Sequence, residues 1–262
     1  MPRPPGTGEG EAMLTLTESL PTGALIGGER HALAAAVAQS DGRWFAATPD
    51  AVVREADAIT GWRAMTGDVT AKAAAPNSGN SRLEKGPPHA LACEAGLHCG
   101  FELGDFAPKV DRFTAAVVYT SPRNEAKTLL AVRTGASRNV IYLTEADGVL
   151  QATDRDGSFS VTLPLSALGG PTRLAILCYT GRGIVLRAGG LTVAEDGRAS
   201  DMNHPGTFLI GCRSSRSGLA KTLGASLLHD VLFWPDRALL ASDLADDHAA
   251  LAALARHYRW AY

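Results

Sequence analysis

The 262-residue sequence lacks an excess of basic charge, a long apolar run and a secretory signal pattern. Its formal net charge is only −2, so no basic field favours nucleic acid or an anionic membrane as a partner. No apolar run approaches the roughly 18 residues of a membrane-spanning helix. The first residues lack the basic-then-apolar pattern of a secretory signal, which predicts a protein made in the cytoplasm and not exported by that route. Aromatic residues are sparse at 6%, but an apolar content of 45% suffices for one large domain and an extension.

Cysteine is also scarce, with four residues in the chain. Cys178 and Cys212 lie within apolar runs and are predicted to be buried free thiols. Cys93 and Cys99 would fit a small disulfide loop, but two consecutive strands fit better. A zinc site built from Cys93, His98 and Cys99 lacks the usual CxxC spacing and a fourth ligand. The sequence therefore predicts no metal at these cysteines.

Most of the chain is a succession of short runs rich in β-branched and apolar residues, separated by Gly and Asp turns at roughly ten-residue intervals. No alternation of strands with helices is present, which argues against a doubly wound or βα-barrel fold. The pattern predicts an antiparallel sandwich or barrel. The clearest strands are expected over residues 113–119, 128–133, 139–143, 148–152, 159–163, 174–179 and 184–188.

The first part of the chain has a different character. Residues 1–12 are rich in Pro and Gly and are expected to be ordered only if a partner holds them. Residues 30–39 predict a short helix and residues 43–47 a short strand. We interpret residues 1–51 as an N-terminal extension or attachment arm and residues 52–262 as the sandwich. An N-terminal strand that completes the sandwich is the alternative.

The last part of the chain has a recognisable order of elements. Two apolar strands are predicted, over residues 207–212 and 226–234, and Pro235 ends the second because proline donates no ladder hydrogen bond. A helix follows, with Ser242 as its predicted N-cap and acidic residues in its first turn. Its apolar face is predicted to comprise Leu244, Leu251, Leu254 and Tyr258.

This closing segment resembles that of laminin-G-like, or concanavalin A-like, lectin domains. The matching residues are Ile210-Gly211, Gly218, Asp230-Val231-Leu232-Phe233-Trp234, Arg237-Ala238-Leu239 and the helix from Ser242. The resemblance implies an all-β fold, an antiparallel β-sandwich (jelly roll) with a short C-terminal helix. It also implies a glycan-recognition or adhesion module. Similar domains recur in spikes, fibres and decoration proteins, so a component of a phage-like particle that attaches to a host surface is one expected setting.

Sandwiches of this kind also occur as glucanases. Those enzymes place carboxylates on one strand as E-x-D-x-x-E, because a strand's period of two puts them on one face. The acidic pairs at Glu55, Glu145 and Glu195 do not complete that pattern. No G-x-S-x-G motif is present, and His229-Asp230 is interpreted as an outward-facing part of an alternating strand. The sequence therefore predicts that the chain is not an enzyme, with a polysaccharide hydrolase or lyase as the lesser alternative.

Binding through loops remains, since sugar hydroxyls require amide or acidic acceptors. The predicted ligand-binding residues are Asn77, Asn80, Asp154, Asp156, Asn203, Arg213 and Arg216. Asp154 and Asp156 would also suit calcium, although a tight turn explains them more simply. No other cofactor is expected.

Four tryptophans complete the set of candidates. Trp62 and Trp234 are predicted to lie in the core. Trp44, Trp260 and Tyr262 are predicted to be exposed or buried by a partner. The expected partners are therefore a cell-surface polysaccharide and, through the N-terminal arm, other proteins of an oligomeric assembly. A purely structural packing block of such an assembly is the main rival interpretation.

Overall fold

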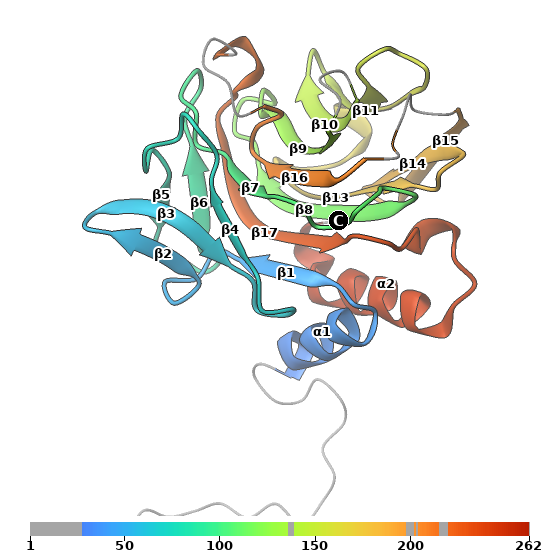
Figure 1. Cartoon of the computed structure of the whole chain (residues 1–262), viewed down its shortest axis with the longest axis horizontal. Helices are drawn as coiled ribbons and strands as arrows, with labels where there is room; N and C mark the ends of the chain where they lie inside the picture. The colour runs from blue at the N-terminus through green and yellow to red at the C-terminus, as the bar shows by residue number, and fades with distance from the viewer. Residues whose placement is uncertain (1–27, 136–138, 198–201, 203, 215–219, 262) are drawn as a thin grey trace, which may run out of the picture.

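The computed structural model describes residues 28–135, 139–197, 202, 204–214 and 220–261. Within these residues the protein is an antiparallel β-sandwich with two helices below it (Figure 1). The predicted fold class, with its short C-terminal helix, is confirmed. Residues 1–27, Asn203, Arg216, Gly218 and Tyr262, which carried several predictions, lie outside the described residues.

Sheet A is formed by strands in the order β15-β14-β13-β8-β17-β6-β5, and β1 also pairs with β17. Its central strands, β8 and β13, are apolar on both faces because the sheet is covered on both sides. The strands are β1 (Arg43–Ala46), β5 (Arg82–Glu84), β6 (Ala90–Cys93), β8 (Phe113–Thr120), β13 (Thr172–Tyr179), β14 (Gly183–Ala188), β15 (Leu191–Asp196) and β17 (Ser226–Trp234).

Sheet B faces sheet A and has the order β12-β11-β10-β9-β16-β7-β4-β3-β2. The predicted hairpin around Asp147-Gly148 joins β10 to β11, and both turn residues have positive φ. The strands are β2 (Val52–Glu55), β3 (Ala58–Arg63), β4 (Thr70–Ala73), β7 (Phe101–Leu103), β9 (Lys127–Thr134), β10 (Val140–Ala146), β11 (Val149–Asp154), β12 (Ser160–Pro164) and β16 (Gly206–Ile210).

The main core lies between the two sheets, and β17 shows how the sequence builds both sides of sheet A. Val231 and Phe233 point into the core between the sheets, where the ring of Phe233 stacks on Phe208 with centroids 4.1 Å apart. Leu232 and Trp234 point to the opposite face. This alternation follows from the period of two of a β-strand.

The second face of sheet A is covered by α1 (Gly28–Gln39) and α2 (Ala245–His257) (Figure 1). Leu33 and Val37 of α1 and Leu254 of α2 bury their side chains against Leu232 and Trp234. Short 3₁₀ turns complete the chain at η1 (Leu165–Ala167), η2 (Ala220–Thr222), η3 (Leu239–Ala241) and η4 (Arg259–Ala261). No helix in the described part of the chain is long and apolar enough to cross a membrane.

The part of the predicted N-terminal arm that the structure describes is built into the domain. Strand β1 pairs with β17 in register from Arg43–Phe233 to Ala46–Asp230. Phe45 enters the core between the sheets, and Trp44 lies on the helix side. Residues 28–51 therefore contribute a helix and a strand to the sandwich, which is the alternative arrangement that the sequence allowed.

The start of α2 differs from the prediction. Ser242 is not the N-cap, because the helix begins at Ala245 and the cap position is Leu244, which makes no side-chain cap. The Ser242 hydroxyl instead accepts a hydrogen bond from the Leu244 backbone N–H at 3.2 Å. Ser242 thus shapes the bend before the helix, while Asp246 and Asp247 lie in the first turn as expected.

Candidate ligand-binding site

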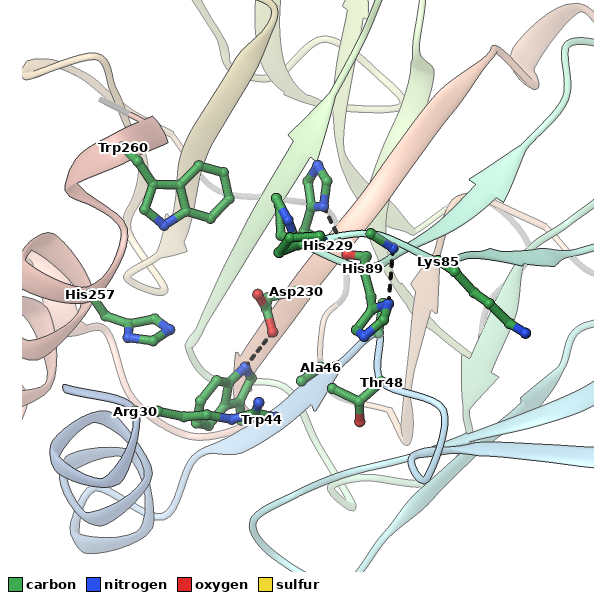
Figure 2. Close-up of a pocket in the computed structure, with 14 residues that line it drawn as sticks. Arg30, Trp44, Ala46, Thr48, Lys85, His89, His229, Asp230, His257 and Trp260 are labelled. Atoms are coloured by element: carbon green, nitrogen blue, oxygen red, sulfur yellow. Dashed lines mark hydrogen bonds between the residues drawn. The ribbon is translucent and has the colours of Figure 1, made fainter. Parts of the chain in front are cut away.

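A hollow lined by polar and aromatic side chains lies where the helices meet sheet A. We call it the Asp230 pocket; it has a volume of about 750 Å³. It is lined by Arg30, Trp44, Ala46, Ala47, Thr48, residues 85–89, His229, Asp230, His257 and Trp260. Figure 2 shows His257 and Trp260 on the helix side, Lys85 and His89 on the opposite side, and Asp230 between them.

Asp230 forms the polar floor of this pocket. Its side chain is on the helix-facing side of β17, and Oδ1 accepts a hydrogen bond from Trp44 Nε1 at 2.8 Å (Figure 2). Burial raises the pKa of this carboxyl to about 7, although the Trp44 bond, the charge of Arg30 and the nearby Tyr258 hydroxyl all oppose the rise. The guanidinium of Arg30 lies over the Trp44 ring, 5.6 Å from its centroid. At neutral pH the carboxyl of Asp230 is therefore present in both its charged and its neutral form.

His229 lies at an irregularity in β17. The register of β17 against β8 shifts between Leu228 and Asp230, so His229 falls in the shift. Its ring is held at both nitrogens, with Nδ1 2.9 Å from the His89 carbonyl oxygen and Nε2 2.8 Å from Thr120 Oγ1. Burial lowers the pKa of His229, which favours a neutral ring. The ring meets Trp260 edge-on at a centroid distance of 5.9 Å.

Two buried polar atoms beside the pocket have no hydrogen-bond partner among the described residues, His257 Nδ1 and the Tyr258 hydroxyl. Burial, and next the charge of Asp230, raise the pKa of Tyr258 well above its usual range. Burial lowers the pKa of His257. Buried polar groups are nearly always satisfied in folded proteins, so the unpartnered Nδ1 of His257, a residue of the pocket lining, indicates a place where a ligand can supply the missing bond.

Trp260 supplies the apolar surface of the pocket. Its side chain is 47% exposed, whereas the other large aromatic side chains near it are buried. His229 and Tyr258 contact its ring edge-on, so the indole is supported from beneath while its remaining surface faces outward. Its exposure is one of the two states that the sequence allowed, and its role as a partner contact stays a prediction. An exposed, supported indole beside unpaired polar atoms is an arrangement that binds an amphipathic ligand.

Trp44 does not fit the same prediction. It is only 1% exposed, and it is buried by this chain rather than by a partner, between His257 and the Asp230 carboxyl. Its burial results from the pairing of β1 with β17, which places the indole beneath the helices. Trp62 and Trp234 are fully buried, as predicted.

The predicted asparagines have structural roles. Asn77 is buried, and its Oδ1 accepts hydrogen bonds from the backbone N–H groups of Gly79 (3.0 Å) and Asn80 (2.9 Å). Asn77 Nδ2 donates to the Gly100 carbonyl at 2.9 Å. Asn80 Nδ2 donates to the His98 carbonyl at 2.8 Å. Both side chains thus fix the 74–81 loop against the segment before β7, because their polar atoms are engaged with backbone.

The other predicted loop residues are not brought together with the pocket. Asp154 is buried at the end of β11, and its Oδ1 accepts from the Phe159 N–H at 3.4 Å, which closes the turn before β12. Asp156 is exposed in that turn. Arg213 lies over the Tyr142 ring, 4.8 Å from its centroid, on the outer side of sheet B. In the described ranges no three His, Cys, Asp or Glu residues are grouped to hold a metal ion.

A second polar cluster lies inside the sandwich, and its members Tyr119, Glu145 and Arg173 are buried. Glu145 of β10 bridges to Arg173 Nη1 of β13 at 2.8 Å and accepts from the Tyr119 hydroxyl of β8 at 2.7 Å. Its other oxygen faces the Ala126 N–H at 3.4 Å. Arg173 Nη2 donates to Asn124 Oδ1 at 3.0 Å. This cluster ties sheet B to sheet A and does not line the Asp230 pocket.

The cysteines are all free thiols. Cys93 ends β6 in sheet A, and Cys99 precedes β7 in sheet B, so the two consecutive strands belong to opposite sheets. A hydrogen bond from Cys93 lowers the pKa of Cys99 to about 7. Cys178 and Cys212 are buried, as the sequence predicts.

Comparison with solved structures supports the fold. The binding domain of botulinum neurotoxin serotype D/C matches 82% of this chain and 52% of its own, with 7% identity and a TM-score of 0.54. A sialidase of Trypanosoma rangeli matches 82% of this chain at 15% identity, with a TM-score of 0.46. Domains LG4-5 of the mouse laminin alpha1 chain match 65% of this chain at 14% identity, with a TM-score of 0.39. The likeness to a laminin-G-like jelly roll is confirmed at the level of the fold.

The comparisons also limit and correct the sequence interpretation. No protein-family model and no curated protein matches the sequence. The chain corresponds to about half of the neurotoxin domain, to 44% of the laminin chain and to about a third of the sialidase. The prediction that the chain is not an enzyme does not stand, because the structures that it resembles include enzymes, the sialidases. The fold leaves an enzymatic activity open.

Proposed function

We propose that this protein is a carbohydrate-recognition domain and that the Asp230 pocket holds the sugar. The observation that carries the proposal is the exposed ring of Trp260 beside a buried polar atom of the pocket lining that lacks a partner in the described residues, His257 Nδ1. A sugar ring has an apolar face that packs on an indole and hydroxyl groups that both donate and accept hydrogen bonds.

The size and composition of the pocket agree with this ligand. Its volume of about 750 Å³ lies within the roughly 300–1,000 Å³ that small-molecule sites occupy. The lining offers an acceptor at Asp230 and donors at Arg30 and Lys85. In the described part of the chain neither cationic side chain forms an ion pair with a carboxylate, so both remain able to bind a ligand.

A glycan array tests the proposal with three forms of the full-length protein. The wild type is expected to bind a related set of sugars in a saturable manner. Trp260→Ala is expected to lose that binding, because it removes the apolar platform. Leu244→Ala is the matched control, since it removes another exposed apolar side chain at the opposite end of α2. A chelator in a parallel array shows whether a metal ion takes part.

Two results would contradict the proposal. The first is binding that survives in Trp260→Ala, which would place the sugar elsewhere. The second is a blank array with wild-type protein that is folded and monodisperse, which would favour the structural packing block. A place in a phage-like particle that attaches to a host surface, with the N-terminal arm (residues 1–51) as the contact to other proteins, stays a prediction from the sequence, and deletion of residues 1–30 with an assembly assay tests it.

A further inference from the structure

A tight reversal of the chain brings two cysteines together between the sheets. Cys93 is the last residue of β6 in sheet A, and Cys99 lies just before β7 in sheet B. The turn between them is closed by a hydrogen bond from the Leu97 N–H to the Glu94 carbonyl at 3.2 Å, and Gly96 within it has a positive φ of 77°. The two thiols are hydrogen-bonded to each other, so one sulfur from each sheet lies beside the other.

The Cys93 thiol reaches the backbone of sheet B. A Cβ placed on Gly211, which follows β16 of that sheet, would lie 3.6 Å from Cys93 Sγ and 3.8 Å from Gly100 Cα. Gly100 is the residue after Cys99, whose own carbonyl accepts a hydrogen bond from Ser81 Oγ at 2.8 Å. The Cys93 sulfur therefore lies against an anchored segment that includes Cys99, and the contact between the thiols is built into the fold.

This pair differs from the other two cysteines in accessibility and in charge. Cys93 is partly exposed, whereas Cys178 and Cys212 are buried. Burial raises the pKa of both Cys178 and Cys212, which keeps them as unreactive thiols. In the pair, the shared hydrogen bond lowers the pKa of Cys99 to about 7 and raises that of Cys93. The pair therefore loses one proton near neutral pH and keeps the other between its sulfurs.

We propose that Cys93 and Cys99 form a redox-sensitive site, at which a small disulfide such as oxidised glutathione converts the two thiols into a disulfide that links sheet A to sheet B. The structure shows the reduced form of this site. Neither cysteine lines the Asp230 pocket, so the inference does not depend on sugar binding.

The exchange takes place in two steps and begins at the accessible sulfur. When the shared proton lies on Cys99, the thiolate of Cys93 attacks one sulfur of oxidised glutathione, whose S–S bond breaks, and one glutathione leaves as a thiolate. Cys99 then loses its proton and attacks the Cys93 sulfur, which displaces the second glutathione. Two electrons pass from the cysteine pair to oxidised glutathione, and the two thiol protons balance the two molecules of reduced glutathione that form.

Mass spectrometry of the full-length protein, equilibrated with mixtures of reduced and oxidised glutathione, tests the proposal. Excess oxidised glutathione is expected to remove two hydrogens from the chain, and digestion without a reductant is expected to yield one cross-linked product that contains Cys93 and Cys99. Excess reduced glutathione is expected to restore both thiols. Cys178→Ala is the matched control, because it removes a thiol outside the pair and is expected to form the same disulfide.

Single variants test the order of the steps. Cys99→Ser is expected to retain one glutathione on Cys93, because the thiol that would displace it is missing. Cys93→Ser is expected to retain at least about tenfold less, because the remaining thiol of the pair is buried. Three results with the folded wild type, which do not depend on the variants, would overturn the inference. They are a chain that stays reduced in excess oxidised glutathione, a chain that retains glutathione without forming the cross-link, and a disulfide between Cys93 and Cys212.

Discussion

Two clusters in this protein contain the same three groups, a carboxylate, an arginine and a tyrosine, in opposite states of hydrogen bonding. Between the sheets, Glu145 is bonded by both Arg173 and Tyr119. In the pocket, Asp230 is bonded by Trp44 Nε1, and the Tyr258 hydroxyl lies beside its carboxyl without a well-directed bond among the described residues. The first carboxylate is paired with a cation, and only Arg173 Nε lacks a partner there, whereas the second carboxyl has no ion pair in the described residues.

The difference shows how to separate structural from functional polar groups in this fold. A buried ion pair is tolerated when hydrogen bonds compensate the charges, and Glu145 satisfies that requirement by linking three strands. At Asp230, which is partly buried and has no ion pair in the described residues, desolvation outweighs the nearby donors and raises the pKa. Variants at Glu145, Asn77, Trp260 and Asp230 test this difference between structural and ligand-binding polar groups.

Glu145→Ala is expected to cause the largest loss of stability. It leaves the Arg173 guanidinium buried without its partner, which typically costs about 3–5 kcal/mol. Denaturant unfolding measures the change. The double variant Glu145→Leu/Arg173→Met is the control, because it removes both charges and is expected to regain most of the loss. A single-variant loss below about 1 kcal/mol would contradict a structural role for the cluster.

Asn77→Ala is expected to destabilise the domain by about 1–3 kcal/mol without changing sugar binding. The variant leaves three backbone groups without the partners that the side chain provides. Unfolding curves and calorimetric titration with the array's strongest sugar measure the two effects. If Asn77→Ala lost sugar binding without losing stability, the sugar site would lie at the 74–81 loop, as the sequence predicted.

Trp260→Ala is expected to weaken sugar binding at least about tenfold, as is common for a central aromatic contact. Trp260→Phe is expected to retain more of the affinity, since a smaller ring still offers an apolar face. Because the indole is 47% exposed, stability is expected to change little, by under about 1 kcal/mol. Equal affinities for all three proteins would show that the ring does not contact the sugar.

The pH dependence of folding is expected to show the smallest effect. The folded-state pKa of Asp230 is raised to about 7 from its usual 3.8, so the folded protein binds a proton more tightly than the unfolded chain. Below pH 3.8 Asp230 therefore does not lower the free energy of unfolding. As the pH rises from 3.8 to about 7, the free energy of unfolding falls, because the unfolded chain loses this proton first. Because the carboxyl is only partly buried and water screens its charge, Asp230→Asn is expected to remove only about 1 kcal/mol of that slope. An identical slope in both proteins would show that the folded carboxyl has an ordinary pKa.

The strands were predictable because each follows from a local pattern. The apolar run from Phe113 gives β8, and the Asp147-Gly148 turn gives the β10–β11 hairpin. The alternation of core and helix-side residues in β17 also follows from the sequence, up to its bulge. Such features depend on neighbours in the chain and on the period of the strand.

The pocket was not predictable, because it depends on contacts between distant residues. Trp44 and Asp230 are 186 residues apart, and they meet only because β1 pairs with β17. The bulge that holds His229 breaks the alternation on which an outward position was predicted. The one local signal was the adjacent pair His229-Asp230 within an otherwise apolar strand, since polar groups there must find partners. Asn77 was predicted to bind a ligand, but its side chain is already bonded to the backbone of its own loop and of Gly100.

The most direct test uses the indole N–H signals of the four tryptophans. Trp44 and Trp260 line the Asp230 pocket, whereas Trp62 and Trp234 are buried and bonded to Ala46 and Ser40. The full-length protein, labelled with nitrogen-15, is titrated by NMR with the array's strongest sugar. The account predicts that the Trp44 and Trp260 signals shift with saturation while those of Trp62 and Trp234 stay in place. Saturable binding that leaves Trp44 and Trp260 unchanged would contradict it.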